Sequence, residues 1–531
     1  MPMNQIILYD AQQQHWLRFS QPQQIITTND LSALLANFKL VNELVEQNKL
    51  YATGFISYEA ASAFDSALHT HKTDTFPLLW FGLFNKPEII NLPEITSNQE
   101  FALNWSPTVT KTKYNQAIAE IKQNISQGKT YQVNYTMRLQ AEFSADPWQY
   151  FLQLVQGQQA NYSAYFDLAD FAICSASPEL FFQWQDQKIT TRPMKGTVAR
   201  GYSTQSDRQL AQWLHTSAKN RAENVMIVDM IRNDLAKIAE SNTVKVPSLF
   251  DVEQYPTLWQ MTSTVTARSK ASLPEIMSAL FPCASITGAP KASTTKIIKQ
   301  LEPTPRKIYT GTIGLIRPNN SAQFNVAIRT VLIDKKSKQA EYGVGGGIVW
   351  DSASASEYEE CQVKARVLLN QYQDFKLLET LLWKPKEGYF LLDRHLQRLQ
   401  QSADYFQFPL DLALVEKQLS AKANTLKNYP YKIRLLISKN EQIVIEAITL
   451  SEKITKKNEN KTITLGIATQ SIEIKNPFLY HKTTNRDIYR LARQSQPNCD
   501  DVLLWNDRQE ITESCIANVV FKIEDLSLIH I

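Results

Sequence analysis

The sequence predicts an α+β fold arranged in two large domains, and three observations support this. The chain has 531 residues, which is too long for one ordinary hydrophobic core. Apolar residues recur at helical spacing in some segments, for example at Tyr114, Ile118, Ile121 and Ile125. In other segments apolar and polar residues alternate strictly, as they do from Tyr131 to Phe143.

The first part of the chain mixes both patterns. Residues 1–105 alternate short apolar and polar runs and predict strands and helices in an N-terminal region. A helix is expected over 114–127, ended by Gly128, and a strand with one apolar and one polar face over 131–143. Further elements are expected in this order: a helix at about 218–240, strands over 308–350, and a helix from Ser356 to Gln371.

A new unit is expected after a join at 371–375. Strands at 377–383 and 388–392 lead into an amphipathic helix whose buried side is marked by Leu396, Leu399, Ala403 and Phe406. A hairpin follows, 431–438 against 442–450, and then a polar surface loop at 452–461. We therefore expect one domain at 1–372, with its core at 106–372, and a second at 373–531.

Composition narrows the class of protein. Hydrophobic residues make up 43% and charged residues 20%, which is typical of a folded globular chain. A net charge of +4 with scattered basic residues argues against a nucleic-acid-binding surface. The chain shows neither an N-terminal signal pattern nor an apolar run long enough to cross a membrane. Five dispersed cysteines indicate a reducing compartment, so we expect a cytoplasmic protein.

Four segments of the first half carry residues suited to binding a small anion through a metal ion. Glycines at 345–347 allow backbone amides to approach a carboxylate. Glu223 and Glu360 are hard oxygen ligands of the kind that Mg²⁺ prefers, and Arg329 and Lys364 can pair with carboxylates. Each feature alone is more often a turn, a solvated helix face or a surface lysine. Their combination is what favours a site.

The ordered motifs of this region resemble the chorismate-binding family, which includes anthranilate synthase component I, isochorismate synthases and aminodeoxychorismate synthase component I. The resemblance runs from Tyr114 to about Leu369. It implies two antiparallel sheets packed face to face and surrounded by helices. The motifs are Gly128-Lys-Thr-Tyr-Gln-Val-Asn134, Ala222-Glu-Asn224, Ile231-Arg-Asn-Asp-Leu235, Phe281-Pro-Cys283, Ile286-Thr-Gly-Ala-Pro-Lys291, Tyr309-Thr-Gly311 and Ala327-Ile-Arg-Thr330.

Within that family, a lysine at position 195 is similar to the aminodeoxychorismate synthases, whereas anthranilate synthases have alanine there. The resemblance implies that Lys195 attacks the chorismate ring at carbon 2, that Glu179 protonates the departing 4-hydroxyl, and that ammonia then displaces the lysine. It implies Mg²⁺ ligands and a substrate lining, as follows: Glu223 and Glu360 for the metal; Gly196, Thr197, Tyr309, Arg329, Gly345, Gly346, Gly347 and Lys364 for the substrate.

Two positions depart from the family pattern. Gln260 stands where many relatives have histidine, and Ala284 replaces a usual glycine. The chain also shows no Cys-His-Glu glutaminase pattern, so the resemblance implies that a separate glutamine amidotransferase subunit, or free ammonia, supplies the nitrogen.

Three motifs of the second half resemble fold-type IV pyridoxal-phosphate (PLP) enzymes, the group that holds branched-chain aminotransferase and aminodeoxychorismate lyase. They are Leu391-Leu-Asp-Arg-His-Leu-Gln-Arg-Leu399, Tyr480-His-Lys-Thr-Thr-Asn-Arg486 and Asp501–Ser514 with Ala517-Asn518. The resemblance implies that Lys482 forms the Schiff base with PLP, Arg398 binds its phosphate and Glu513 faces its pyridine nitrogen. The Lys-Thr-Thr-Asn-Arg string is more similar to the lyase.

The expected activity is therefore a fused pair of consecutive steps, chorismate to 4-amino-4-deoxychorismate and then to para-aminobenzoate for folate. Residues 373–531 are short for this PLP fold, so we expect an incomplete lyase domain that binds PLP weakly or not at all. Two alternatives remain: an anthranilate-type synthase joined to an aminotransferase-like domain, and a chorismate-binding regulatory protein without turnover.

Overall fold

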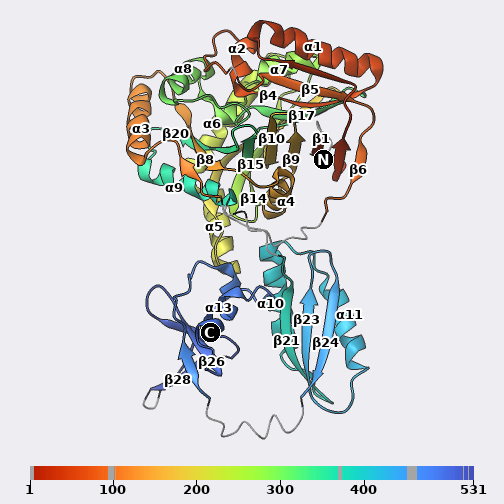
Figure 1. Ribbon diagram of the computed structural model, residues 1–531, viewed down its shortest axis with the longest axis vertical. Helices are drawn as coiled ribbons and strands as arrows, with labels where there is room; N and C mark the ends of the chain where they lie inside the picture. The colour runs from red at the N-terminus through yellow and green to blue at the C-terminus, as the bar shows by residue number, and fades with distance from the viewer. Residues whose placement is uncertain are drawn as a thin grey trace. The chain divides into compact units, whose positions relative to one another are not determined.

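The computed structural model describes residues 5–73, 75–93, 101, 103–368, 374–450, 463–517, 519–523 and 526–530. Their contacts divide the chain into two units, which are described separately (Figure 1). The first comprises Met1–Ala199 and Ala211–Tyr372, and the second Arg200–Leu210 and Gln373–Ile531. The expected boundary between residues 372 and 373, and the expected loop at 452–461, lie outside the described residues.

Two ten-stranded sheets form the first unit, and the strand pairings of its described residues within them are antiparallel. The first sheet runs β16 (Gly288–Ala289), β8 (Gln132–Glu142), β20 (Gln339–Ile348), β19 (Thr330–Asp334), β10 (Phe171–Ser177), β9 (Tyr162–Asp167), β1 (Gln5–Asp10), β2 (His15–Phe19) and β6 (Glu88–Ile90), with β7 (Ser106–Pro107) beside β8. The second runs β13 (Met194–Ala199), β15 (Leu258–Arg268), β12 (Lys188–Arg192), β11 (Leu180–Gln185), β18 (Ser321–Asn325), β17 (Thr312–Arg317), β4 (Tyr51–Ile56), β5 (Leu79–Phe84) and β3 (Gln24–Thr28), with β14 (Lys245–Gln254) beside β15.

A shared apolar core shows that the two sheets pack face to face. Phe166 and Ile173 of the first sheet belong to one buried cluster with Phe55 and Leu315 of the second. Helices cover the outer faces through two further clusters. The helices are α1 (Leu31–Asn48), α6 (Ala218–Ala236) and α7 (Leu273–Leu280) on the second sheet, and α3 (Lys111–Ser126), α4 (Pro147–Gln158), α8 (Lys291–Leu301) and α9 (Ser354–Ala365) on the first. The predicted α+β class with two packed antiparallel sheets is confirmed.

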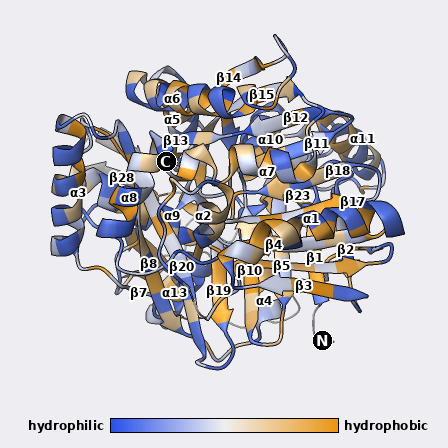
Figure 2. Cartoon of the chain, turned by 90° about the horizontal axis from the view of Figure 1, so that it is seen from above, coloured by the Kyte–Doolittle hydropathy of each residue, from blue (hydrophilic) through white to orange (hydrophobic). Residues whose placement is uncertain are grey.

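Local sequence explains where the main helices begin. The side chain of Thr110 accepts from the backbone of Lys113 ahead of α3, and Ser217 does the same for Asn220 ahead of α6. The outward residues of α3 are polar, as the hydrophilic colours in Figure 2 show. The predicted helices at 114–127 and 218–240 are confirmed, with each beginning or ending a few residues from the expected position.

The second unit holds a four-stranded antiparallel sheet covered by helices. Its strands are β22 (Gly388–Tyr389), β21 (Leu377–Lys384), β23 (Tyr431–Ile437) and β24 (Ile443–Thr449), and its helices are α10 (Leu392–Phe406) and α11 (Leu412–Ala423). The predicted hairpin is confirmed, and so is the apolar side of α10, although Phe406 is only partly buried. A smaller part contains β25 (Leu465–Ile467), β26 (Asp501–Trp505), β27 (Ile511–Ser514), α13 (Asp487–Ser495), β28 (Val519–Ile523) and β29 (Leu526–His530).

The segment Arg200–Leu210 belongs to the second unit although its neighbours in sequence belong to the first. It contains the beginning of α5 (Thr204–Thr216). Arg200 forms a buried ion pair with Asp207 at 2.8 Å, and its guanidinium lies 4.4 Å from the ring centre of Tyr405. The Tyr405 hydroxyl donates to the carbonyl of Gly201 at 2.7 Å. The segment Arg200–Leu210 is thus part of the core of the second unit.

Membrane insertion by a helix has no support in this structure, since none of the helices in the described ranges combines the length and the apolar character that a bilayer crossing needs.

Candidate active site

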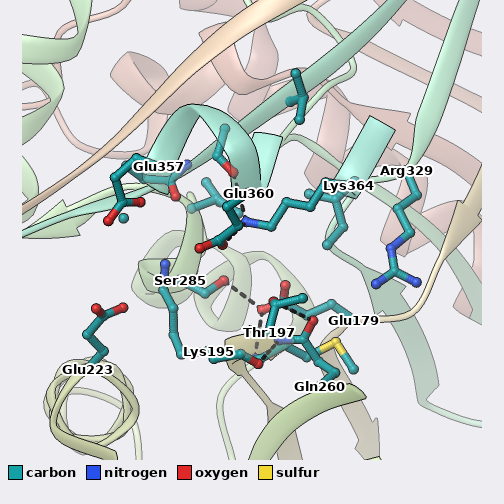
Figure 3. Close-up of a pocket in the computed structure, with 18 of the residues that line it drawn as sticks. Glu179, Lys195, Thr197, Glu223, Gln260, Ser285, Arg329, Glu357, Glu360 and Lys364 are labelled. Atoms are coloured by element: carbon teal, nitrogen blue, oxygen red, sulfur yellow. Dashed lines mark hydrogen bonds and ion pairs between the residues drawn. The ribbon is translucent and has the colours of Figure 1, made fainter. Parts of the chain in front are cut away.

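One cavity of the first unit collects nearly all of the residues predicted for the first site (Figure 3). Its volume is about 120 Å³. The predicted residues that line it are Glu179, Lys195, Gly196, Thr197, Glu223, Tyr309, Arg329, Gly345, Gly347, Glu360 and Lys364. Gly346 does not line it. The cavity also involves residues that were not selected from sequence as site residues: Asn134, Met194, Lys219, Asn220, Gln260, Ser285, Ile286, Ile328, Tyr342, Gly343, Val344 and Glu357.

Lys195 reaches this cavity from a bulge in β13. Met194 pairs with Thr262 and Thr197 pairs with Gln260, so three steps along β13 face two steps along β15. The extra residue bends the strand locally and re-aims a side chain, as bulges commonly do. The side chain of Lys195 is directed into the cavity, and the residue is only 9% exposed.

Burial controls the charge on Lys195. Loss of water lowers the pKa of its amine below the ordinary value, while the carboxylate of Glu223 opposes that shift. Figure 3 shows the amine on the side of the cavity where Glu223 and Glu360 lie. A neutral amine, the form that can act as a nucleophile, is therefore more accessible here than on a surface lysine.

Glu179 lies in the short link between β10 and β11 and is 2% exposed. Its Oε1 accepts a hydrogen bond from the hydroxyl of Ser285 at 2.6 Å and from the backbone amide of Met194 at 3.4 Å. Burial raises the pKa of this carboxyl to about 7, despite the hydrogen bond from Ser285. A carboxyl that keeps its proton near neutral pH can serve as a general acid.

Acidic residues from two helices face the same cavity. Glu223 lies on α6, and Glu357 and Glu360 lie on α9. Glu360 pairs with Lys364 at 2.7 Å; burial acts to raise its pKa, but this pairing lowers it. Burial raises the pKa of Glu223. The amine of Lys219 stands 4.0 Å from Glu223 and 3.5 Å from Glu357, so the acids already attract a cation between the helices.

This donor set fits Mg²⁺ better than a metal that needs a full protein cage. Within the described ranges, no three His, Cys, Asp or Glu side chains converge on a point that could hold a metal. Mg²⁺ keeps several of its waters and takes one or two carboxylates together with oxygens of the substrate. Glu223 and Glu360, on facing helices of a cavity with room for an anion, meet that requirement.

Gly343, Gly345 and Gly347 of β20 also line the cavity. A Cβ on Gly345 would lie 2.3 Å from the carbonyl of Tyr135, and one on Gly347 would lie 2.3 Å from Nε2 of Gln132 and 3.1 Å from Nζ of Lys195. These positions have no space for a side chain. A Cβ on Gly346 would face the acids instead, 3.4 Å from Glu357.

Arg329 supplies a buried positive charge to the cavity. It is 6% exposed, donates to Oε1 of Gln158 at 3.3 Å and lies 5.1 Å from the ring centre of Tyr255. Burial lowers the pKa of its guanidinium, which still remains charged at any physiological pH. With Lys364 it makes the cavity suitable for an organic anion.

A cluster of buried charges supports the cavity from behind. Glu302 accepts from Arg306 Nε at 2.9 Å and from the backbone amide of Thr136 at 2.9 Å. Arg306 also donates to the carbonyls of Asn134, at 2.7 Å, and Ile286, at 2.9 Å. The last two residues line the cavity. Nothing in the sequence pattern pointed to this cluster, because its members come from separate elements.

In the second unit, the three residues predicted for PLP lie in one neighbourhood. Burial lowers the pKa of Lys482, as does the charge of Arg398, and the charge of Glu513 opposes this, which places all three within electrostatic reach. Glu513 accepts from the hydroxyl of Tyr489 at 3.2 Å. Arg398 donates from Nε to Glu379 at 2.8 Å.

These side chains fit PLP in kind: a lysine with a lowered pKa, an arginine and an acid. Arg398 already has a partner, because the carboxylate of Glu379, whose side chain is 2% exposed, neutralises its guanidinium. A phosphate at this position would have to share the arginine with that carboxylate. Asn518, part of the third motif, lies outside the described residues.

Comparison with known sequences identifies two matching families. A profile described as chorismate binding enzyme matches residues 86–370, and one described as amino-transferase class IV matches residues 376–528. Aminodeoxychorismate synthase component 1 of Salmonella typhimurium is 40% identical over 272 residues, which is 51% of this chain and 60% of that protein. The Escherichia coli protein of the same name is 38% identical over 284 residues, 53% and 62% respectively. The chain thus spans about three fifths of the length of these relatives.

Comparison with solved structures supports the fold of the first unit. A putative 2,3-dihydroxybenzoate-specific isochorismate synthase from Bacillus anthracis superposes with a TM-score of 0.59 and 16% identity. The match covers 69% of this chain and 95% of the other. At this level of identity the likeness concerns the arrangement of sheets and helices alone.

Proposed function

Since this chain belongs to the family of chorismate binding enzymes and continues into an amino-transferase class IV domain, we propose that its first unit converts chorismate and ammonia to 4-amino-4-deoxychorismate and water. The observation that carries the proposal is the placement of Lys195, buried in a cavity with the acids Glu223 and Glu360 and with Glu179, whose pKa burial raises to about 7. The two named relatives, both aminodeoxychorismate synthases, support it.

The proposed reaction uses each group at a stated atom. The neutral amine of Lys195 adds to ring carbon 2 while the 4-hydroxyl departs as water with the proton of Glu179. Ammonia then attacks carbon 4, the bond between carbon 2 and the lysine breaks to release the neutral amine, and the proton that the new amino group loses returns to Glu179. Glu223 and Glu360 would hold Mg²⁺, which neutralises the ring carboxylate. Arg329 and Lys364 bind carboxylate oxygens and fix the orientation of the ring.

We propose a separate glutamine amidotransferase as the source of ammonia. The relatives that match the first unit are named as component 1 of a synthase, which implies a second component in those proteins. Purified chain should therefore turn over chorismate with ammonium salts and not with glutamine alone. Glutamine-dependent turnover by the isolated chain would contradict this arrangement.

For the second unit we propose release of pyruvate from the product of the first, which leaves para-aminobenzoate; this activity requires PLP, which we expect residues 373–531 to bind weakly at best. The bound PLP would supply the electron sink for this elimination. Lys482 would hold the cofactor and move the proton, Arg398 would pair with its phosphate, and Glu513 would face the pyridine nitrogen. Assaying chorismate with ammonia and PLP, with and without an added lyase, tests this: 4-amino-4-deoxychorismate that only the added enzyme converts would exclude the activity from this chain.

Substitution of Lys195 tests the first activity directly. Lys195→Ala should lower formation of 4-amino-4-deoxychorismate by roughly 10²-fold or more, the scale of losing one catalytic group, and should abolish a covalent adduct detected by mass spectrometry. Lys188→Ala, an exposed lysine of β12, is the matched control. Full activity in Lys195→Ala would remove the lysine from the reaction, and direct appearance of anthranilate would favour an anthranilate-type synthase.

A further inference from the structure

The residues that carry the amine of Lys195 are not held by regular strand pairing. In the register of β13 against β15, Met194 and Thr197 have partners, whereas Lys195 and Gly196 have none. Gly196 adopts φ of +97°, a conformation that favours glycine, and a Cβ there would lie 3.1 Å from Cβ of Asn220. A bulge leaves its extra residue unpaired, so the position of the amine depends on contacts outside the ladder.

Gln260 makes those contacts with both ends of its side-chain amide. Its Nε2 donates to the carbonyl of Gly196 at 2.8 Å, and its Oε1 accepts from the hydroxyl of Thr197 at 3.1 Å. The residue lies on β15 and is only 7% exposed. In Figure 3 its side chain lies beside Thr197. One buried amide therefore connects the two residues that follow Lys195 to the neighbouring strand.

We propose that Gln260 is a positioning residue for Lys195: its amide replaces the strand pairing that the bulge removes and keeps the amine directed at the bound ring. This inference rests on the proposed role of Lys195 as the nucleophile. A side-chain amide is well suited to the task, because its donor and acceptor sit on one terminal group and it does not ionise. An imidazole carries its donor and acceptor on different sides of a ring and loses the acceptor on protonation.

The test compares Gln260→Leu with Gln323→Leu. Gln323 lies on β18, is 4% exposed, donates to the carbonyl of Tyr9 at 3.2 Å and accepts from the amide of Ala11 at 3.3 Å. It does not line the cavity. Both substitutions remove a buried amide that is bonded at both ends, so loss of fold stability is matched between them.

Two readouts are taken from each variant. The first is the rate at which trinitrobenzenesulfonate labels Lys195 in the full chain without substrate, followed by mass spectrometry of the peptide. The rate should rise several-fold in Gln260→Leu, because the amine is no longer held in its buried position. The second is steady-state turnover of chorismate with ammonia. Here kcat should fall roughly tenfold to hundredfold from misplacement of the nucleophile, with KM changed by less than about threefold.

Gln260→His provides a second variant should Gln260→Leu fail to fold. It should retain part of the wild-type kcat above the pKa of the new imidazole and lose it below, since protonation removes the acceptor for Thr197. The wild type should lack this additional ionisation and show only those of Glu179 and Lys195. A Gln260→His profile parallel to that of the wild type would overturn the proposal.

The labelling arm separates this inference from the proposed function. If the wild type makes no 4-amino-4-deoxychorismate, the function fails, yet faster labelling in Gln260→Leu than in Gln323→Leu still supports placement of the amine by Gln260. Equal labelling in the two variants overturns the inference, whatever the turnover.

Discussion

Removal from water acts on Glu179 and Lys195 in opposite directions. It raises the pKa of the carboxyl to about 7 and lowers the pKa of the amine. Both groups therefore shift toward their uncharged forms inside one cavity. An uncharged acid and an uncharged amine are what a proton donor and a nucleophile require, so a single physical cause prepares both partners.

The pH dependence of turnover should reflect Glu179. Because the acid must carry its proton, kcat should fall as pH rises through about 7, the pKa to which burial raises this carboxyl. Turnover should also fall toward acid pH as the amine of Lys195 becomes protonated, from the lowered pKa of that group. The measurement is kcat from pH 5 to 9 at a constant concentration of unprotonated ammonia. A rate that stays flat from pH 6 to 9 would exclude Glu179 as the proton donor.

Single residues were predicted unevenly from sequence. Lys195, Glu179 and the two proposed metal ligands came from ordered motifs, and the structure brings them to one cavity. Ser285 and Gln260 were not predicted as site residues, although Gln260 was noted as a departure from the family pattern, because their contribution is a hydrogen bond to another side chain or to the backbone across the fold. Ser285 directly precedes the family motif that begins at Ile286, and this position next to a motif was the sequence feature that could have indicated it.

At the level of elements, β8 shows what alternation can and cannot predict. The strand itself is confirmed, with polar residues on one face. Most of that face is buried rather than solvated: Asn134 lines the cavity, and Arg138 is 2% exposed beside Glu302, whereas Gln140 and Glu142 at its end are exposed. A strand pattern reports which residues share a face, whereas the environment of that face depends on elements far away in the chain.

Gly347, the last glycine of β20, allows the strand to pass close to the amine of Lys195. Gly347→Ala should lower kcat by roughly 10²-fold, the scale expected when a reacting group is displaced by about 1 Å, because the new Cβ would lie 3.1 Å from Nζ of Lys195 and 2.3 Å from Nε2 of Gln132. Steady-state kinetics and circular dichroism of the purified variant provide the measurement.

Gly343→Ala is not a suitable control, since a Cβ there would clash with the ring of Tyr309. Gly128→Ala has no atom within 4 Å of the new Cβ, but its φ of +69° strains the backbone, so it controls for the cost of replacing a glycine outside the cavity. A kcat equal to that of the wild type in Gly347→Ala would show that the surrounding residues accommodate the new Cβ without displacing the amine of Lys195.

Across the whole first unit, buried ionic contacts join parts of the chain that no local pattern connects. Glu302 of the segment after α8 bonds Thr136 of β8 and Arg306, which in turn reaches Ile286. Both sheets likewise pair strands that are far apart in sequence, with β8 beside β20 and β4 beside β17. Long-range pairings of this kind are set by packing, so sequence predicted the class of fold and not its strand order.

Loss of one partner of this buried cluster should destabilise the first unit strongly. Glu302→Ala leaves Arg306 and Arg138 buried without their carboxylate, which should cost about 3–5 kcal/mol. Glu88→Ala, in the exposed pair with Arg18 at 2.5 Å, should cost about 0–1 kcal/mol. Hydrogen exchange of peptides from β8 in increasing urea measures this locally, which matters because a chain of two units does not unfold in one step. Similar losses of unfolding free energy in Glu302→Ala and Glu88→Ala would contradict a stabilising role of the buried cluster.

The excursion Arg200–Leu210 limits how the two halves can be separated. It leaves β13 directly after the strand that bears Lys195 and belongs to the core of the second unit, where Arg200, Asp207 and Tyr405 interact. A chain that ends at residue 372 would keep this segment but lack Tyr405. The ion pair between Arg200 and Asp207, which is buried in the full chain, would then be exposed. Fragments that contain one unit alone would need a redesigned surface at this segment.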